Sequence, residues 1–213
     1  MSTDKPVLEL KNLKVRIPVK NGQARPVDGI SFKIASGKTL ALVGESGCGK
    51  TMTALSLIQL LPPGAFMESG EILINGDDFA AMDERHKRDM RGSRVSMIFQ
   101  EPMTSLNPVF TVGEQISEVT RLHQNLSRAE ARSAAVKMIS DVGLPDPERL
   151  YGQYPHTLSG GQRQRIMIAI ALACRPGLLI ADEPTTALDV TIQAEILDLL
   201  NDLKATFNSA VLL

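Results

Sequence analysis

The chain has 213 residues, of which 43% are hydrophobic and 22% are charged, which suits one large globular domain, or a domain with an insert, built on a hydrophobic core. The net charge of −1 gives no overall basic field for nucleic acid, so we expect no nucleic-acid partner. The longest apolar run, residues 166–174, is too short to span a bilayer, and two cysteines predict neither a disulfide framework nor a zinc site. The first residues carry no basic-then-apolar signal segment, so we expect the chain to stay in the compartment where it is made.

The first part of the chain predicts a small antiparallel sheet. Residues 7–19 alternate loosely between apolar and polar side chains, and residues 30–34 do so again after a loop that contains glycine and proline. Alternation of this kind is typical of strands that bury one face. We therefore expect these two strands to pair ahead of the glycine-rich segment that follows.

Residues 44–51 read GESGCGKT and match the phosphate-binding loop pattern G-x-x-x-x-G-K-[ST]. An apolar strand at 39–43 leads in and a helix at 52–61 leads out, which is the context that the pattern requires. The alternative is a glycine-rich turn with an incidental lysine, which does not explain why a strand precedes the motif and a helix follows it. Backbone N–H groups of the loop would point at phosphate oxygens, Lys50 would reach the β- and γ-phosphates, and the Thr51 hydroxyl would ligate Mg²⁺. The loop residues that we expect to bind the nucleotide are Gly44, Glu45, Ser46, Gly47, Cys48, Gly49, Lys50 and Thr51.

The chain after this helix alternates short strands with a charged helix. Pro62-Pro63-Gly64 breaks the helix, a short strand at 71–74 closes at the turn signal Asn75-Gly76, and residues 82–91 form an exposed charged helix. A further strand at 94–99 ends at Gln100. Residues 105–154 are polar and helix-prone, which predicts a helical insertion between two strands of the nucleotide-binding core.

Within the insertion, residues 127–130 make a capping box, and Gly143 is a plausible terminator for the helix that starts there. The apolar residues of that helix recur at helical spacing and predict a packed face. These residues are Ala131, Ala134, Met138 and Val142.

Residues 158–162 read LSGGQ and open a helix that runs to about Cys174. Ser159 is a good N-cap, so one interpretation of this segment is purely structural: the serine caps the helix. The adjacent Gly160 and Gly161 leave N–H groups bare at a positive helix end, which predicts a second anion site. Two such ends far apart in one sequence suggest that two copies of the chain share nucleotides.

Residues 178–181 form a continuous apolar strand that ends in two acids, Asp182 and Glu183. Acids at the carboxyl end of a buried strand lie where open α/β sheets place ligand chemistry, although a solvated acidic strand end is the alternative. Asp182 fits an acid that orients Mg²⁺, and Glu183 fits the general base. Asp189 precedes a helix with an apolar face. One interpretation is that it merely caps this helix. Residues 209–213 begin another apolar strand.

The chain resembles the nucleotide-binding subunit of an ABC transporter in the order and spacing of three motifs. These are GESGCGKT, LSGGQ and LLIADEP, the strand with its acids. Three further segments are similar to those of the dipeptide, oligopeptide and nickel importer branch: FQEPMTSLNP at 99–108, YPH at 154–156 and ADEPTTALDV at 181–190. The resemblance implies an α/β fold with a P-loop NTPase core, a mainly parallel sheet, an N-terminal antiparallel β subdomain and an inserted α-helical subdomain. It implies one ABC nucleotide-binding domain over residues 1–213, with the insert at 104–157 and an incomplete C-terminal end.

The resemblance also implies partners and site residues. Two cassettes pair head to tail around ATP and Mg²⁺, at the cytoplasmic face of the inner membrane, on two transmembrane permease subunits that a periplasmic solute-binding protein serves. Residues 101–108 and the helical insert would face the permease. Glu183, Gln100 and Lys50 would be catalytic, and Thr51, Gln100 and Asp182 would hold the metal. The residues implied to contact nucleotide beyond the phosphate loop are Gln100, Ser159, Gly160, Gly161, Gln162 and Asp189, where Ser159 and Gly161 serve the partner's γ-phosphate.

Two departures from the family pattern matter. The family carries an aromatic side chain near the first strands that stacks on adenine, whereas residues 15–18 offer none, and Ile17 would make a weaker apolar contact. The family's switch histidine lies beyond residue 213, so we expect either a fragment or a naturally shortened chain, with poor ATPase activity. The alternatives to an importer subunit are a non-transport accessory ABC ATPase and a truncated cassette that binds ATP but hydrolyses it weakly.

Overall fold

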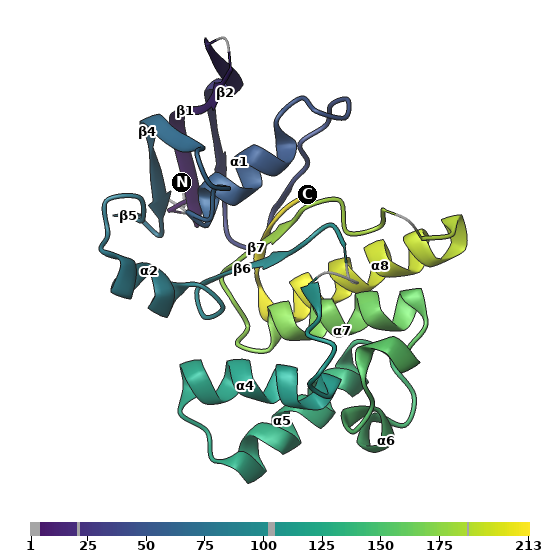
Figure 1. The fold of residues 1–213 in the computed structure, drawn as a ribbon. Helices are drawn as coiled ribbons and strands as arrows, with labels where there is room; N and C mark the ends of the chain where they lie inside the picture. The colour runs from purple at the N-terminus through teal and green to yellow at the C-terminus, as the bar shows by residue number, and fades with distance from the viewer. Residues whose placement is uncertain (1–4, 21, 102–104, 187) are drawn as a thin grey trace.

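The computed structural model describes residues 5–20, 22–101, 105–186 and 188–213. An antiparallel sheet lies at one end of the molecule, a parallel sheet in the middle and a group of helices at the opposite end (Figure 1). The first residue of the insert expected at 104–157, part of the permease-facing segment at 101–108 and residue 187 of the acidic motif fall outside the described residues.

The antiparallel sheet has the strand order β2-β1-β4-β5. Its strands are β1 (Leu8–Val19), β2 (Gly22–Ile34), β4 (Phe66–Ile74) and β5 (Asp77–Asp78). The strands expected at 30–34 and 71–74 are therefore longer than predicted, and β4 joins this sheet from the far side of the phosphate loop. The first half of β2 is exposed and polar because β2 is an edge strand, so it lacks the apolar alternation on which the prediction depended.

The parallel sheet has the order β3-β8-β7-β6, and each neighbouring pair is parallel, as predicted. Its strands are β3 (Thr39–Leu40), β8 (Ala210–Leu212), β7 (Leu178–Ala181) and β6 (Val95–Ile98). Every residue of β6, β7 and β8 is buried, which explains why β7 and β8 are continuously apolar and why β6 is apolar except at Ser96. The strand expected at 39–43 is wrong in length: it ends at Leu40, although the Leu42 N–H still donates to the Leu213 carbonyl, and Val43 is 95% exposed.

Helix α1 (Lys50–Leu57) begins inside the phosphate-loop motif and ends four residues before the predicted terminus at 61. Its end is fixed by Arg91, whose guanidinium donates hydrogen bonds to the carbonyls of Ile58 and Gln59 at 2.7 and 3.1 Å. These carbonyls have no partner further along a helix, so Arg91 satisfies groups that would otherwise be orphaned.

The other helices are α2 (Glu84–Met90), α4 (Val112–Gln124), α5 (Arg128–Asp141), α6 (Pro147–Tyr151), the short 3₁₀ turn η1 (Pro155–Thr157), α7 (Gly160–Leu172) and α8 (Val190–Phe207). The capping box of Ser127 and Glu130 at the start of α5 is confirmed. The stripe expected on α5 needs a correction: Ala134 is only half-buried, whereas Ala135 and Ile139 lie in the core, because the buried face is centred one residue later.

Two groups of buried side chains form the core. One joins the antiparallel sheet, α1 and one side of the parallel sheet, and the other joins the opposite side of that sheet to α4–α8. No helix in the described part of the chain has the length and apolar character that a membrane span requires. The two cores hold the carboxyl ends of β6 and β7 beside the start of α1, and the candidate site lies there.

Candidate functional site

The phosphate loop adopts a backbone that glycine alone adopts without strain at two positions. Gly47 and Gly49 have φ of 81° and 99°, and a Cβ built on Gly49 would lie 2.1 Å from the carbonyl oxygen of Pro26. Gly49 is the N-cap of α1, so the loop feeds its N–H groups directly into the positive end of that helix. The loop is a cradle that added side chains would fill.

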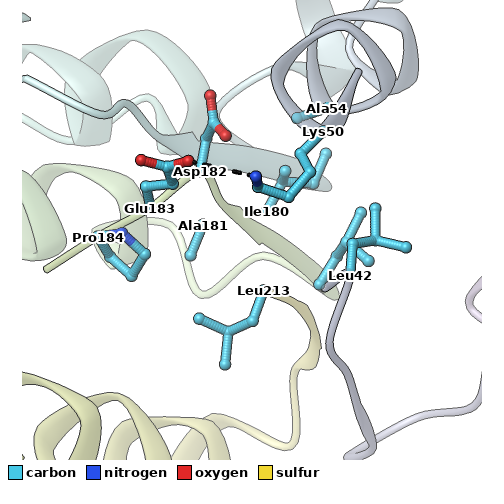
Figure 2. A pocket seen from close by; sticks show the side chains of 10 residues that line it. Leu42, Lys50, Ala54, Ile180, Ala181, Asp182, Glu183, Pro184 and Leu213 are labelled. Carbon is cyan, nitrogen blue, oxygen red and sulfur yellow. Dashed lines mark ion pairs between the residues drawn. The ribbon is translucent and has the colours of Figure 1, made fainter. Parts of the chain in front are cut away.

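Lys50 folds back over the loop that precedes it. Its Nζ donates hydrogen bonds to the carbonyl oxygens of Gly44 and Glu45, at 2.8 and 3.1 Å. The same Nζ lies 3.6 Å from Glu183 Oε1 across the site, as the dashed line in Figure 2 marks. A single ammonium group therefore links the phosphate loop to the acids that follow β7.

Thr51, the residue after Lys50, contacts Asp182, which follows β7. Thr51 Oγ1 donates a hydrogen bond of 3.2 Å to Asp182 Oδ1, and the Asp182 N–H donates to the Ile98 carbonyl of the neighbouring strand. Asp182 is only 6% exposed. Burial raises the pKa of its carboxyl, and the negative charge of Glu183 raises it further, whereas the Thr51 hydroxyl and the Lys50 ammonium oppose the rise.

Glu183 is held by donors from three parts of the described chain. Gln100 Nε2 donates to Glu183 Oε2 at 2.8 Å, Thr186 Oγ1 donates to the same oxygen at 3.0 Å, and Lys50 approaches Oε1. The backbone of Glu183 is left-handed, with φ of 48°. Non-glycine residues in this conformation cluster at functional sites, where the surrounding contacts hold them.

An apolar pocket of about 200 Å³ lies below these acids. Figure 2 shows Leu42, Ile180 and Leu213 around it, with Lys50, Asp182 and Glu183 along one rim. The pocket walls come from α1, β7 and β8 and from the segments that follow β3, β7 and β8. The pocket therefore places an apolar wall beside the Asp182 carboxylate.

The donor set fits Mg²⁺ bound together with a polyphosphate. The Thr51 hydroxyl and the Asp182 carboxylate present hard oxygen ligands 3.2 Å apart, and Mg²⁺ is held in many sites by one or two carboxylates plus substrate phosphates and water. The described residues include no cluster of three or more His, Cys, Asp or Glu side chains that could hold a metal alone. The metal would therefore depend on the phosphates for the rest of its coordination, with Gln100 beside it.

The segment predicted to form a second anion site lies at the start of α7. Ser159 Oγ accepts from the Gln162 N–H, and Gln162 Oε1 accepts from the Ser159 N–H, so the predicted N-cap is confirmed as a full capping box. Gly160 lies against Leu188, just before α8, and Gly161 lies against Ile192 in the first turn of α8. Within the described residues, no hydrogen bond or ion pair joins 158–162 to the phosphate loop at 44–51.

Asp189 is the N-cap residue of α8, but its side chain makes no capping hydrogen bond. The carboxylate is exposed, and Val190 beside it is 83% exposed. The interpretation of Asp189 as a helix cap therefore explains the position of the residue, but the part of the chain that the structure describes gives its carboxylate no capping hydrogen bond.

Three residues near the site were not assigned a specific role from the sequence beyond membership of the loop or motif. Cys48, for which the sequence predicts neither a disulfide nor a zinc site, is exposed in the phosphate loop. Pro26 lines the pocket at the loop, although a β-edge proline carried no signal for that role. Thr186 stood inside the acidic motif without an assigned function, and a hydroxyl three residues after the candidate base was the available signal.

The glycine loop, the lysine over it and the two acids at the end of β7 define a nucleotide-binding domain of the phosphate-loop type. The family model described as "ABC transporter" matches residues 27–186. The chain belongs to the ABC transporter family.

Curated relatives and solved structures agree with that assignment. The oligopeptide transport ATP-binding protein AppD of Bacillus subtilis is 52% identical over 208 residues, which are 97% of this chain and 63% of AppD. A probable peptide ABC transporter ATP-binding protein, y4tR of Sinorhizobium fredii, is 51% identical over 207 residues, 97% of this chain and 62% of y4tR. The dimeric ATP-binding cassette MJ0796 bound to ADP and Pi superposes with a TM-score of 0.84 at 25% identity, covering 96% of this chain and 86% of that chain.

The chain spans less than two thirds of the length of these two curated relatives. It includes the phosphate loop, the LSGGQ segment and both acids. The α/β fold of an ABC ATPase cassette predicted from the sequence is confirmed by the solved cassettes.

Proposed function

We propose that the chain is the ATP-binding and ATP-hydrolysing subunit of an ABC importer for peptides. The observation that supports this most directly is the convergence of Lys50, Thr51, Asp182 and Glu183 at the carboxyl ends of the parallel strands. Relatives named for peptide and oligopeptide transport support the choice of solute class. The same names give no support to an accessory ATPase outside transport.

The proposed chemistry follows from the positions of the side chains. The loop N–H groups and Lys50 bind the β- and γ-phosphates, and Thr51 with Asp182 holds the metal. Mg²⁺ supplies neutralisation of the charge that develops on the phosphate oxygens. Glu183 accepts a proton from the water that attacks the γ-phosphorus, and Gln100, which donates to Glu183, lies beside both the base and the metal position.

A second cassette is part of the proposal. Residues 158–162 present the start of α7 without a bond to this chain's own phosphate loop, so Ser159, Gly160, Gly161 and Gln162 would contact the nucleotide held by a partner cassette. Asp189 would face that partner. A homologous cassette has been solved as a dimer in a post-hydrolysis state.

The permease partners would bind the other exposed edge. Val109 and Phe110, at the start of the helical region, are 70% and 51% exposed, and Phe99 at the end of β6 is 40% exposed. Large apolar side chains that stay exposed are candidates for protein contact. We propose that this edge, with the helical insert at 104–157 of a single nucleotide-binding domain, faces two permease subunits at the cytoplasmic side of the inner membrane, with a periplasmic solute-binding protein acting on the other side.

The test combines phosphate release with assembly. Glu183→Gln keeps the shape of the side chain but cannot accept a proton at neutral pH, so turnover should fall by about 10²–10⁴, and Mg²⁺-ATP should drive the variant into dimers detectable by light scattering. Glu118→Gln, a matched change on the exposed face of α4, should leave turnover unchanged. Undiminished turnover in Glu183→Gln, with monomers in the presence of ATP, would contradict both the base and the dimer.

A further inference from the structure

The turn that follows β7 contains a threonine whose hydroxyl faces the Glu183 carboxylate. Thr186 Oγ1 donates to Glu183 Oε2 at 3.0 Å, and the Thr186 N–H donates to the Glu183 carbonyl at 3.1 Å. Both contacts join the same two residues. The hydroxyl is therefore fixed relative to the carboxylate by the backbone of the turn itself, and little side-chain freedom is lost in forming the bond.

The two oxygens of the Glu183 carboxylate have different surroundings. In the described part of the chain, Oε2 accepts hydrogen bonds from Gln100 and Thr186, whereas the contact of Oε1 is the Lys50 ammonium at 3.6 Å. An oxygen that already accepts two donors is the poorer acceptor for a further proton. Oε1 is consequently the oxygen available to a water molecule beside the phosphate loop.

The partners of Glu183 also differ in what else they must do. Under the proposed function, Lys50 binds the phosphates and Gln100 lies at the metal, so both contacts compete with the nucleotide. Thr186 is exposed, and its hydroxyl makes a hydrogen bond to Glu183 and to no other described side chain. Thr186 is therefore the partner that can stay with the carboxylate throughout the reaction.

We propose that Thr186 is a positioning residue for ATP hydrolysis, which holds Glu183 Oε2 so that Oε1 faces the attacking water; this inference rests on the proposed function. As the water oxygen bonds to the γ-phosphorus, its proton passes to Oε1 and the bond from phosphorus to the bridging oxygen breaks. The products are ADP, which keeps the bridging oxygen, and inorganic phosphate. Thr186 neither gains nor loses a proton in this step.

A role limited to the stability of the turn makes a different prediction. Glu183 has a left-handed backbone, and the Thr186 contacts help to hold it, so a structural role would lower the melting temperature and leave the rate constant alone. A positioning role lowers kcat at constant KM, because the contact matters when the proton moves.

The experiment compares three threonine substitutions in the full chain. Thr186→Val removes the hydroxyl at constant shape, and Thr186→Ser retains it. Thr206→Val makes the same change on the exposed face of α8, where, among the described residues, the hydroxyl bonds to the Asp202 carbonyl alone. We expect kcat to fall about tenfold in Thr186→Val, the rate equivalent of one hydrogen bond to a charged group, with KM and ATP affinity unchanged. Thr186→Ser should restore most of kcat, and Thr206→Val should match the parent. Equal kcat in Thr186→Val and the parent would overturn the proposal.

A second readout does not need hydrolysis. The carboxyl ¹³C resonance of Glu183, identified by its disappearance in Glu183→Gln, should shift in Thr186→Val and stay near the parental position in Thr186→Ser. If the parent fails to hydrolyse ATP, the proposed function fails, and this resonance decides the Thr186 contact: a shift confined to Thr186→Val supports it, and an unchanged resonance overturns it. If Glu183→Gln is already present, adding Thr186→Val should lower the remaining rate no further, and a full additional loss would also overturn the proposal.

Discussion

The hydroxyl of Thr51 donates a hydrogen bond of 3.2 Å to the carboxylate of Asp182, although 131 residues separate them in the sequence. Thr51 lies in the first turn of α1, and Asp182 follows β7. The contact exists because parallel strands bring their carboxyl ends to one edge of the sheet, where the loop after β3 also arrives. It joins the two halves of the proposed metal site.

Asp182→Asn should separate metal binding from the fold. The amide keeps an oxygen that can accept from Thr51 but loses the charge that attracts Mg²⁺, so the part of ATP affinity that depends on Mg²⁺ should fall by about 1.4 kcal/mol or more, which is tenfold. Titrations with ATP in Mg²⁺ and in EDTA measure that part directly. Asp198→Asn, on the exposed side of α8, is the control.

The same variant should be more stable than the parent in the absence of nucleotide. Burial raises the pKa of Asp182, which means that the ionised carboxylate opposes folding at neutral pH. A neutral amide removes that cost, so the melting temperature in EDTA should rise. A lower melting temperature in Asp182→Asn would contradict a net cost of the buried charge.

Ile17 provides a test of how the site contacts the base. Ile17 is half-buried on β1 and pairs with Ala24 of β2, two residues before Pro26, which lines the phosphate pocket. An aromatic ring at this position should stack on adenine, so Ile17→Tyr should tighten ATP binding by about 1 kcal/mol. Val19→Tyr on the same strand is the control. Equal affinities in both variants and the parent would place the base elsewhere.

Arg91 should matter for stability and not for nucleotide affinity. Its side chain is 16% exposed, and its guanidinium donates to the carbonyls at the end of α1 and to Glu84 Oε1 at 2.6 Å. Arg91→Met leaves those carbonyls unpaired and should lower the free energy of unfolding by about 1–3 kcal/mol. Arg88→Met, an exposed change on the same helix, should stay within about 0.5 kcal/mol of the parent.

The effect of Arg91→Met should also depend on pH. The hydrogen bond from Arg91 lowers the pKa of Glu84. A carboxyl with a lowered pKa stabilises the fold above its unfolded pKa, and the stabilisation is lost as the pH falls through its folded pKa. The difference between parent and Arg91→Met in urea unfolding should therefore shrink at acidic pH, and a constant difference would assign the whole effect to the α1 carbonyls.

The sequence predicted the parts of the site that follow from local pattern. The glycine loop, the cap at Ser159 and the buried strand before Asp182 each depend on neighbouring residues, and all of them lie where they were expected. The extent of β2 and β4 was missed because their outer residues are mostly exposed and do not alternate between apolar and polar side chains. They become strands by pairing with β1. Pairing of that kind is a tertiary effect that alternation within one segment does not report.

Contacts that depend on the tertiary structure were also not predicted from the sequence. The position of Pro26 beside Gly49 depends on how the antiparallel sheet packs on the loop, and the bond from Thr186 depends on the left-handed backbone at Glu183. Neither follows from spacing. By contrast, the pairing of Gln100 with Glu183 brings together two residues that family resemblance had already singled out.

Calorimetric titration of the chain with Mg²⁺-ATP, compared with Lys50→Ala, tests the central claim most directly. Lys50 Nζ lies over the loop and faces Glu183, so its removal should weaken ATP binding by about 1–3 kcal/mol, the scale of a charge-assisted contact. The control, Lys38→Ala, changes an exposed lysine beside β3 and should bind ATP like the parent. Circular dichroism should show that all three chains are folded. Weaker binding in Lys50→Ala alone is the predicted result, and equal ATP affinity in the folded parent and Lys50→Ala would contradict the account.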